Sequence, residues 1–325
     1  MMMLFLHLFS NLDVTEQCHN LIYFWNGKPL AFVLKKFAAM CVPVYIFISG
    51  YGLMCKYASS PDMNNGLRIL KLYLNYWLIF LIFIPLACYT SPSVYPNGIV
   101  ELVLNFVGIS FSYNGAWWFL LPYIILVSVS SRLIHFLSSC SVKECVISMI
   151  IAEALSVTGY ILVDFYRENI LWKELLVVVL NTIYLLFMFV VGILFSRYKL
   201  FDKIRIAFTN QQHFVVITTM ILIILKLCIG ASSLIHPVFV VLLLSAYVTL
   251  KKPLWFTRSL QHLGKHSTNI WLLHYFFITV FCREWIYSFK YPMLIFVVLF
   301  LISYISSVVI KSINQVICLI VQRVF

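Results

Sequence analysis

The sequence predicts an all-α polytopic membrane protein, a bundle of about ten transmembrane helices that forms a single integral membrane domain over residues 1–325. Composition is the first reason. Hydrophobic residues make up 63% of the chain, only 10% are charged, and the mean hydropathy is +0.99, values that exclude a soluble domain. The second reason is that apolar runs long enough to cross roughly 30 Å of hydrocarbon recur from end to end. The third is the uneven distribution of basic residues among the segments that link these runs.

The N-terminal segment Met1–Phe9 is apolar, and the polar residues Ser10–Asp13 follow it. At a rise of 1.5 Å per residue, its roughly nine residues extend about 14 Å, half the hydrocarbon thickness. It has neither a basic start nor a small-residue cleavage site, which argues against a signal peptide. We expect it to be the outer half of a first span whose beginning is missing from this chain, so that the first helix is truncated.

The remaining apolar runs supply the other spans. They lie near residues 36–57, 67–89, 116–137, 144–163, 174–196, 212–230, 235–250, 268–287 and 291–318. Glycine and proline are sparse and lie mainly at the junctions between runs, as expected for uninterrupted helices. The chain has no internal repeat and no long polar stretch, so we expect no separate soluble domain.

The net charge of +12 comes from 23 basic and 11 acidic residues. If the first span exits outward, most of the basic residues fall in the inner segments, whereas the outer segments are nearly balanced. This positive-inside bias predicts a multi-pass protein of the inner, or plasma, membrane with both termini in the cytoplasm and lipids as its surroundings. It accounts for the basic residues without a nucleic-acid partner. Some of them could also hold an anionic cytosolic substrate such as the phosphates of a coenzyme.

Two candidate sites lie in the first two spans. His7 sits just before the polar edge of the first span. A histidine there can titrate near neutrality and serve as a general base, or it is simply an interfacial residue with a hydrated ring. In the second span, Ser49 lies beside Gly50 and close to Gly52. Such small residues let a ligand approach closely, and they also serve ordinary helix packing in membranes.

Arg68 and Lys71 open the third span, three positions apart on one helix face. They could clamp a phosphate, or they could extend their charged ends to lipid headgroups. Trp117 and Trp118 follow the turn at Asn114, where the next span begins. The two tryptophans fit an interfacial aromatic belt, or alternatively a platform on which a sugar stacks.

Three polar residues lie in or beside later spans. Glu153 lies near the middle of a span, where a carboxylate is costly, so it is either a functional group or a protonated group bonded to a neighbouring helix. Ser267 is expected to cap the helix that follows it. His274 lies seven residues further along, on nearly the same helix face, and it either serves a site or bonds a neighbouring helix.

Taken in order, these segments resemble the motifs of the acyltransferase-3 family of integral membrane O-acyltransferases. The resemblance spans essentially the whole chain. The matching segments are Met2–Ser10, Val42–Leu53, Arg68–Trp77, Trp117–Leu120, which reads WWFL, and Leu263–His274, which reads LGKHSTNIWLLH.

The resemblance implies an O-acyltransferase that moves an acyl group, usually from acetyl-CoA in the cytosol, to a hydroxyl of a cell-surface or exported polysaccharide or of a lipid-linked sugar in the bacterial cell envelope. It implies that His7 is the catalytic base or a transient acyl carrier, and that Arg68, together with Lys71, binds the coenzyme. The family also has a basic residue about ten positions before its catalytic histidine, which here would precede Met1. The residues that we assign to supporting or acceptor-side positions are Ser49, Trp118, Glu153, Ser267 and His274.

Two other functions stay open on the sequence. A transporter or flippase for lipid-linked sugars would suit a many-span bundle with a buried Glu153. A polysaccharide polymerase typically relies on a large outer loop with several arginines, and the longest outer loop, about residues 90–115, has neither arginine nor lysine. The nine cysteines are scattered without metal-ligand spacing, so we predict no metal site.

Overall fold

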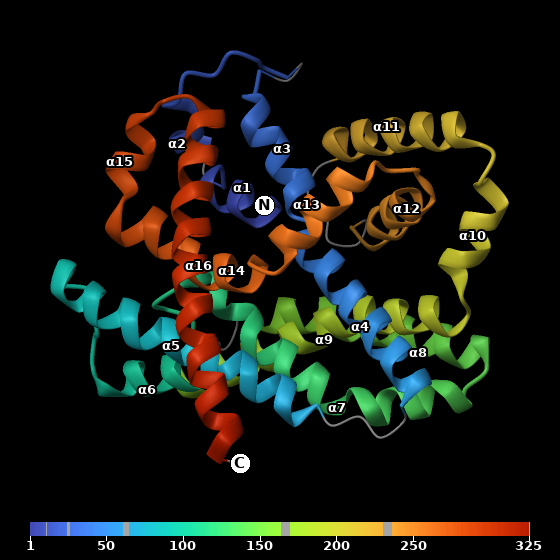
Figure 1. The fold of residues 1–325 in the computed structure, drawn as a ribbon, viewed down its shortest axis with the longest axis horizontal. Helices are drawn as coiled ribbons and strands as arrows, with labels where there is room; N and C mark the ends of the chain where they lie inside the picture. The colour runs from blue at the N-terminus through green and yellow to red at the C-terminus, as the bar shows by residue number, and fades with distance from the viewer. Residues whose placement is uncertain (11, 25–26, 61–64, 164–169, 230–235, 325) are drawn as a thin grey trace.

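The structure, a computed structural model, is helical throughout its described regular elements, as the sequence predicts (Figure 1). It describes residues 1–325 except 11, 25–26, 61–64, 164–169, 230–235 and 325. Across those described ranges there is no strand, only one isolated antiparallel bridge between Tyr23 and Pro29. The predicted all-α fold class is therefore confirmed.

The helices follow one another along the chain with short connections. From the N-terminus to residue 163 the elements are α1 (Met2–Leu8), α2 (Leu12–Glu16), α3 (Leu30–Ala38), α4 (Cys41–Ser59), α5 (Gly66–Thr90), α6 (Ile99–Val107), the 3-10 turn η1 (Gly115–Phe119), α7 (Leu120–Ser139) and α8 (Val142–Val163). The remaining elements are α9 (Ile170–Arg197), α10 (Leu200–Phe208), α11 (Gln212–Cys228), α12 (His236–Thr249), α13 (Leu254–Gly264), α14 (Ser267–Phe276), the π-helical turn η2 (Phe277–Phe281), α15 (Arg283–Ser288) and α16 (Pro292–Val324).

Several apolar helices fit a multi-pass membrane protein. Five in the described part of the chain are long and apolar enough to cross a bilayer: Leu30–Ser59, Gly66–Thr90, Gly115–Ser139, Trp172–Arg197 and Pro292–Ile317. The α10 and α11 helices meet at a bend of 119°. They would add a sixth span if together they form one broken span. The prediction of about ten spans is therefore not confirmed.

Short helices explain much of this difference. The α11 and α12 helices coincide with predicted apolar runs but have only 17 and 14 residues. At 1.5 Å per residue, a helix of the latter length extends about 21 Å, less than the hydrocarbon core. The run predicted over 268–287 ends early because η2 and a break at Cys282 separate α14 from α15. The hydropathy of the sequence locates such apolar runs, but it does not predict the residues at which the helices end.

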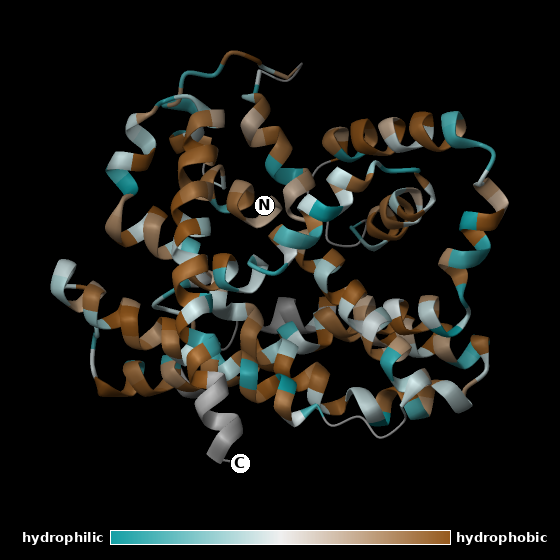
Figure 2. Ribbon diagram, in the orientation of Figure 1, coloured by the Kyte–Doolittle hydropathy of each residue, from teal (hydrophilic) through white to brown (hydrophobic). Residues whose placement is uncertain are grey.

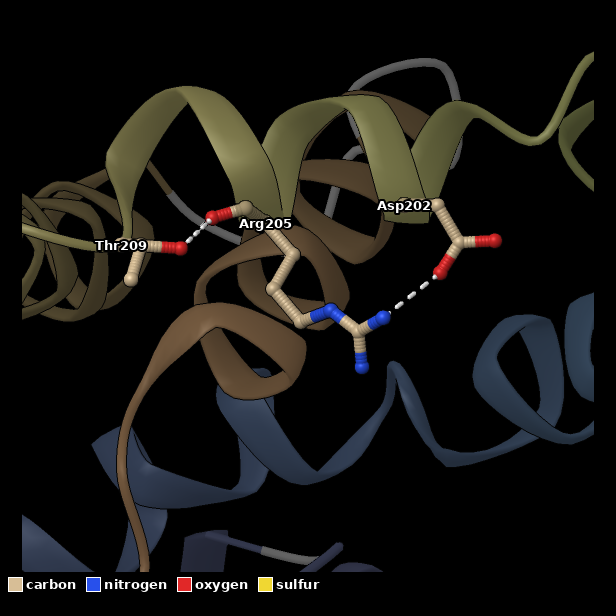
Figure 3. Close-up of polar contacts among 3 residues, drawn as sticks. All are labelled: Asp202, Arg205 and Thr209. Atoms are coloured by element: carbon tan, nitrogen blue, oxygen red, sulfur yellow. Dashed lines mark hydrogen bonds and ion pairs between the residues drawn. The ribbon is translucent and has the colours of Figure 1, made fainter.

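The apolar runs do not predict α10 and α13, two short amphipathic helices. Most of the helical ribbon carries the colour of hydrophobic residues, whereas hydrophilic residues are frequent on α13 and in the turns (Figure 2). On α10, Arg205 pairs with Asp202 at 3.0 Å, and the hydroxyl of Thr209 donates to the Arg205 carbonyl (Figure 3). The ion pair is exposed and so contributes at most about 1 kcal/mol. Trp255 of α13 is also exposed, as is typical of helices that lie at a membrane surface.

The α4 and α9 helices pack closely at two glycines, Gly50 and Gly192. A Cβ on Gly50 would collide with the carbonyl oxygen of Phe189, and a Cβ on Gly192 would collide with that of Phe47. The two glycines thus let the backbones touch, as small residues do between membrane helices. The interpretation of the small-residue patch around Ser49 as helix packing is therefore confirmed for Gly50.

The η1 turn is fixed to α14 by the carbonyl oxygen of Leu272. Trp117 donates its indole N–H to this oxygen at 2.9 Å, and the side-chain amide of Asn114 donates to it at 3.0 Å. Trp117 is 1% exposed and packs against Tyr76 and Phe276. The alternative of an interfacial aromatic belt is therefore wrong for Trp117, because its N–H finds a partner inside the protein rather than at the membrane surface.

The close packing of α4 and α9 predicts an asymmetric response to alanine. Gly50→Ala should lower stability by about 1–3 kcal/mol, because the added methyl group meets backbone that cannot move without separating the helices. Gly52→Ala is the matched control on the same helix, since nothing lies within 4 Å of its Cβ position. Thermal melting of the two purified variants in detergent is the measurement. Equal melting temperatures would contradict the close packing.

Candidate active site

His7 lies on α1, a short helix packed against α3, α14 and α16 in the interior of the molecule (Figure 1). Its imidazole lies beside that of His274 on α14, with ring centroids 5.1 Å apart. The ring of Tyr275 approaches His7 edge-on at 5.3 Å. The structure thus brings together two predicted site residues that lie near opposite ends of the chain.

Hydrogen bonds fix the tautomer of His274. Its Nδ1 lies 2.9 Å from the carbonyl oxygen of Ile270 and 2.9 Å from that of Trp271. Carbonyl oxygens only accept, so Nδ1 of the neutral ring carries the proton and Nε2 keeps a lone pair. The side chain is fully buried, and Nε2 has no hydrogen-bond partner within the described ranges. His274 can therefore accept a hydrogen bond or a proton through Nε2.

His7 borders a cavity of about 330 Å³, which we call the histidine cavity. Its wall combines aromatic side chains with groups that can hydrogen-bond. The lining residues that matter here are His7, Trp118, Tyr184, His236 and Trp271. The structure thus places the predicted residue Trp118 beside His7. The sequence interpretation missed Tyr184 and His236, because nothing in their own segments indicates that α9 and α12 contribute to the cavity that His7 borders.

A second cavity of about 360 Å³, the apolar cavity, adjoins the first. Side chains of α1, α4, α13 and α14 line it, and His274 is among them. Phe119 and Trp271 line both cavities, so the two share a wall. Its lining is mostly hydrocarbon, which suits an uncharged, flexible chain better than a charged group.

Ser267 lines the apolar cavity, but the prediction that it caps α14 is wrong. The helix begins at Ser267 itself, and the N-cap position belongs to His266. The Ser267 hydroxyl donates to the carbonyl of Gly264 at 2.8 Å. It is therefore bonded back to α13 rather than to the free N–H groups at the start of α14.

A third cavity of about 350 Å³, the basic cleft, is lined by four cationic side chains: Arg68, Lys71, Lys265 and Lys311. No carboxylate lines it in the described part of the chain. The Arg68 guanidinium donates to the hydroxyl of Tyr123 at 2.7 Å, which holds it in place. Four cations around one cleft favour a ligand with several negative charges.

The basic cleft includes two lysines that sequence reasoning missed. Arg68 and Lys71 form the predicted pair on α5, whereas Lys265 precedes α14 and Lys311 lies on α16. Both added lysines lie at the basic end of an apolar run, and Lys265 also lies in the motif Leu263–His274. That position is equally consistent with topology alone, so only the packing of the helices shows that the four charges converge.

A chain of buried amides holds the floor of the basic cleft. Asn75 donates to the side chain of Asn269 at 2.5 Å and accepts from Asn314 at 3.1 Å. Asn269 in turn donates to the backbone carbonyl of Ser307 at 3.2 Å. The Ser307 hydroxyl lies 3.0 Å from Nδ1 of His266. These bonds join α5, α14 and α16, so the cations on those helices keep their relative positions.

The three cavities lie in sequence along α14. The basic cleft shares Tyr45 and Thr268 with the apolar cavity, and the apolar cavity shares Trp271 with the histidine cavity. The series starts at fixed positive charge, continues between hydrocarbon side chains and ends at two imidazoles. The order of these adjacent cavities matches the order of groups in a molecule with an anionic head, an apolar arm and a reactive end.

Two predicted site residues lie outside this series. Ser49 is buried in α4, and none of the three cavities is lined by it. Glu153 on α8 borders a small hollow of about 10 Å³ together with Tyr184 and His236, both of which also line the histidine cavity. Glu153 is thus behind the wall of the histidine cavity rather than in it.

A protein-family model described as an acyltransferase domain matches residues 1–312. The chain belongs to the acyltransferase-3 family. Membership confirms the resemblance seen in the sequence and supports an acyltransferase, since members of the acyltransferase-3 family transfer acyl groups and are typically membrane proteins. No curated protein and no solved structure matches the chain significantly.

The amide chain predicts that this acyltransferase is destabilised by Asn269→Ala. The substitution leaves the buried amide of Asn75 without its acceptor, at a cost of about 1–3 kcal/mol. Ser312→Ala is the matched control, since the Ser312 hydroxyl is exposed and donates to the carbonyl of Val308 on its own helix. Thermal melting in detergent checks both variants. A melting temperature for Asn269→Ala equal to that of the control would rule out a structural role for the chain of amides.

Proposed function

We propose that this acyltransferase moves an acyl group, acetyl in the simplest case, from cytosolic acyl-CoA to a hydroxyl of a cell-surface or exported polysaccharide. The observation that supports it is the series of cavities that leads from four cations to the pair His7 and His274. Family membership favours acyl transfer over a transporter or a polymerase. The whole chain, residues 1–325, acts as one membrane domain in this proposal.

The donor suits the first two cavities in order. Coenzyme A carries several phosphate charges at one end and a thioester at the other, joined by an uncharged arm. In the proposal the basic cleft opens to the cytosol, as the positive-inside rule expects of its lysines and arginine. Arg68, Lys71, Lys265 and Lys311 hold the phosphates, the apolar cavity takes the arm, and the thioester reaches the histidines.

The chemistry assigns different roles to the two imidazoles. His7 accepts the proton of the acceptor hydroxyl while the hydroxyl oxygen attacks the thioester carbon. The carbon–sulfur bond then breaks, and His7 returns the proton to the departing thiolate. In this proposal Nε2 of His274, which has no partner in the described part of the chain, accepts a hydrogen bond from His7 when the two adjacent rings reorient during the reaction. It is thus a positioning residue that favours the protonated form of His7, as the carboxylate of a catalytic triad does.

His7 has an alternative role as a transient acyl carrier, and both roles need its ring nitrogen. In that case His7 first takes the acyl group from the thioester, and the acceptor hydroxyl then displaces it from the ring. A two-stage exchange would leave acyl-CoA hydrolysis and acyl exchange between coenzyme molecules measurable without acceptor. A single-stage transfer would not support that exchange.

His7→Ala should lower transfer by at least the roughly 10²–10⁴-fold that a general base contributes. The measurement is acetyl content of the surface glycan in a deletion strain complemented with the wild-type or variant gene, alongside membrane levels of each protein. His274→Gln should retain part of the activity, because its amide can still accept a hydrogen bond. Normal glycan acetylation by a folded and expressed His7→Ala protein would overturn the mechanism.

Lys311→Ala should raise the KM for acetyl-CoA several-fold with little change in kcat, because the lysine meets the phosphates rather than the reacting atoms. The effect should weaken at high ionic strength. Lys203→Ala is the control, since Lys203 is an exposed lysine of α10 away from the cleft.

Acetyl-pantetheine, which lacks the nucleotide phosphates, provides a second control for the same assay. Its KM should be insensitive to Lys311→Ala. Equal effects of the substitution on both donors would show that Lys311 acts on the fold and not on the phosphates.

A further inference from the structure

His236 carries an unexplained polar atom in the wall of the histidine cavity. The residue is the first of α12 and is only 6% exposed. Its Nε2 has no hydrogen-bond partner in the described part of the chain, and the residue lines the cavity that His7 borders. A buried polar atom without a partner is destabilising, and such atoms in native proteins usually bond to a water, an ion or a ligand. The reaction outlined above does not use His236.

The surroundings of His236 show what kind of ligand would use it. Trp118 and Trp271 supply indole rings to the same cavity, and Tyr184 supplies a phenol ring. Pockets with aromatic walls and a few fixed polar groups bind molecules that have both apolar faces and polar edges. A sugar ring is such a molecule, because its C–H groups form two faces and its hydroxyls form the rim.

A small hollow behind His236 does not supply the missing hydrogen bond. It has about 10 Å³ of free volume, roughly the room for one water molecule. Glu153, Tyr184 and His236 all border it. The rest of its lining is apolar: Pro43, Leu185, Phe187, Met188 and Pro237. In the described part of the chain no group of the hollow bonds to Nε2 of His236, so a bound molecule is needed to supply its partner.

We propose that His236 holds the acceptor: its Nε2 forms a hydrogen bond with a hydroxyl next to the one that His7 deprotonates. The inference rests on the proposed function and adds the chemical class that the histidine cavity selects, a ring with at least two adjacent hydroxyls. Two imidazoles in one cavity match two hydroxyls of one ring, whereas an alcohol with a single hydroxyl would leave His236 without a partner. His236 is thus a specificity residue for the acceptor and takes no part in donor binding.

The test compares two minimal acceptors with purified protein in lipid nanodiscs and acetyl-CoA as donor. The acceptors are trans-1,2-cyclohexanediol and cyclohexanol, which differ by one hydroxyl. Wild-type protein should prefer the diol by about tenfold in kcat/KM, the value of one net hydrogen bond near 1.4 kcal/mol. His236→Leu should remove this preference and leave acetyl-CoA binding, measured without acceptor, unchanged within about twofold.

Two further variants make the result decisive. His236→Gln keeps a hydrogen-bonding group at the site and should restore part of the preference for the diol, which a purely structural role would not produce. His7→Ala reports on the proposed function separately, because it should abolish transfer to both acceptors. Transfer to neither acceptor by wild-type protein that still modifies extracted envelope polysaccharide would move the comparison to that polysaccharide, on which His236→Leu should lower kcat/KM about tenfold and His236→Gln should lower it less.

Three outcomes would overturn the inference while leaving acyl transfer intact. One is a wild-type protein that acylates the two acceptors equally well, or a His236→Leu protein that acylates the polysaccharide as well as the wild type does. Another is a His236→Leu protein that keeps the full preference. The third is a His236→Leu protein that loses donor binding in parallel with transfer, which would make His236 a structural residue.

Discussion

The placement of α14 is the constraint on which the rest of the site depends. Near the middle of α14, the carbonyl oxygen of Leu272 accepts hydrogen bonds from Trp117 and Asn114. Nearer its start, Asn269 accepts from Asn75. These bonds satisfy groups that would be costly to leave unpaired in an apolar interior. Because α14 contributes to the walls of all three cavities, a displacement of this one helix would change the shapes of the histidine cavity, the apolar cavity and the basic cleft together.

The polarity of the cavity lining changes from one cavity to the next along α14, and each cavity matches one part of the proposed donor. Charged groups are cheapest where water reaches them, so the four cations gather around a polar cleft floored by amides. The apolar cavity that follows would exclude charge from the passage. The neutral tautomer of His274 then lies where burial is complete, held by the carbonyls of Ile270 and Trp271. The order of environments, more than any single residue, would keep the coenzyme phosphates at one end and the acyl group at the other.

The sequence predicted what depends on local pattern. Apolar runs located most of the long helices, and an ionisable residue in a membrane segment was a sound reason to single out His7 and His274. The sequence-based prediction was wrong where neighbouring residues could each occupy the same structural position. Ser267 was expected to cap α14, yet the chain places His266 there and turns the Ser267 hydroxyl toward Gly264.

The features that the sequence could not predict depend on which helices touch. From the sequence alone, the positive-inside rule accounts for Lys265 and Lys311. The structure shows that the packing of α14 and α16 brings both lysines to the same cleft as Arg68. His236 gains its meaning only when α12 is placed against the cavity of His7. No periodicity in either segment carries that information, because the contacts join segments far apart in the chain.

The α13 helix has one further consequence. None of its 11 residues is buried, yet Leu260 and Leu263 form part of the wall of the apolar cavity, while Trp255 is exposed at the other end of the helix. The α13 helix is thus an exposed wall of the apolar cavity. If α13 lies at the bilayer surface, headgroups or acyl chains would support this wall from outside. Bilayer thickness and headgroup charge would then influence the shape of the cavity.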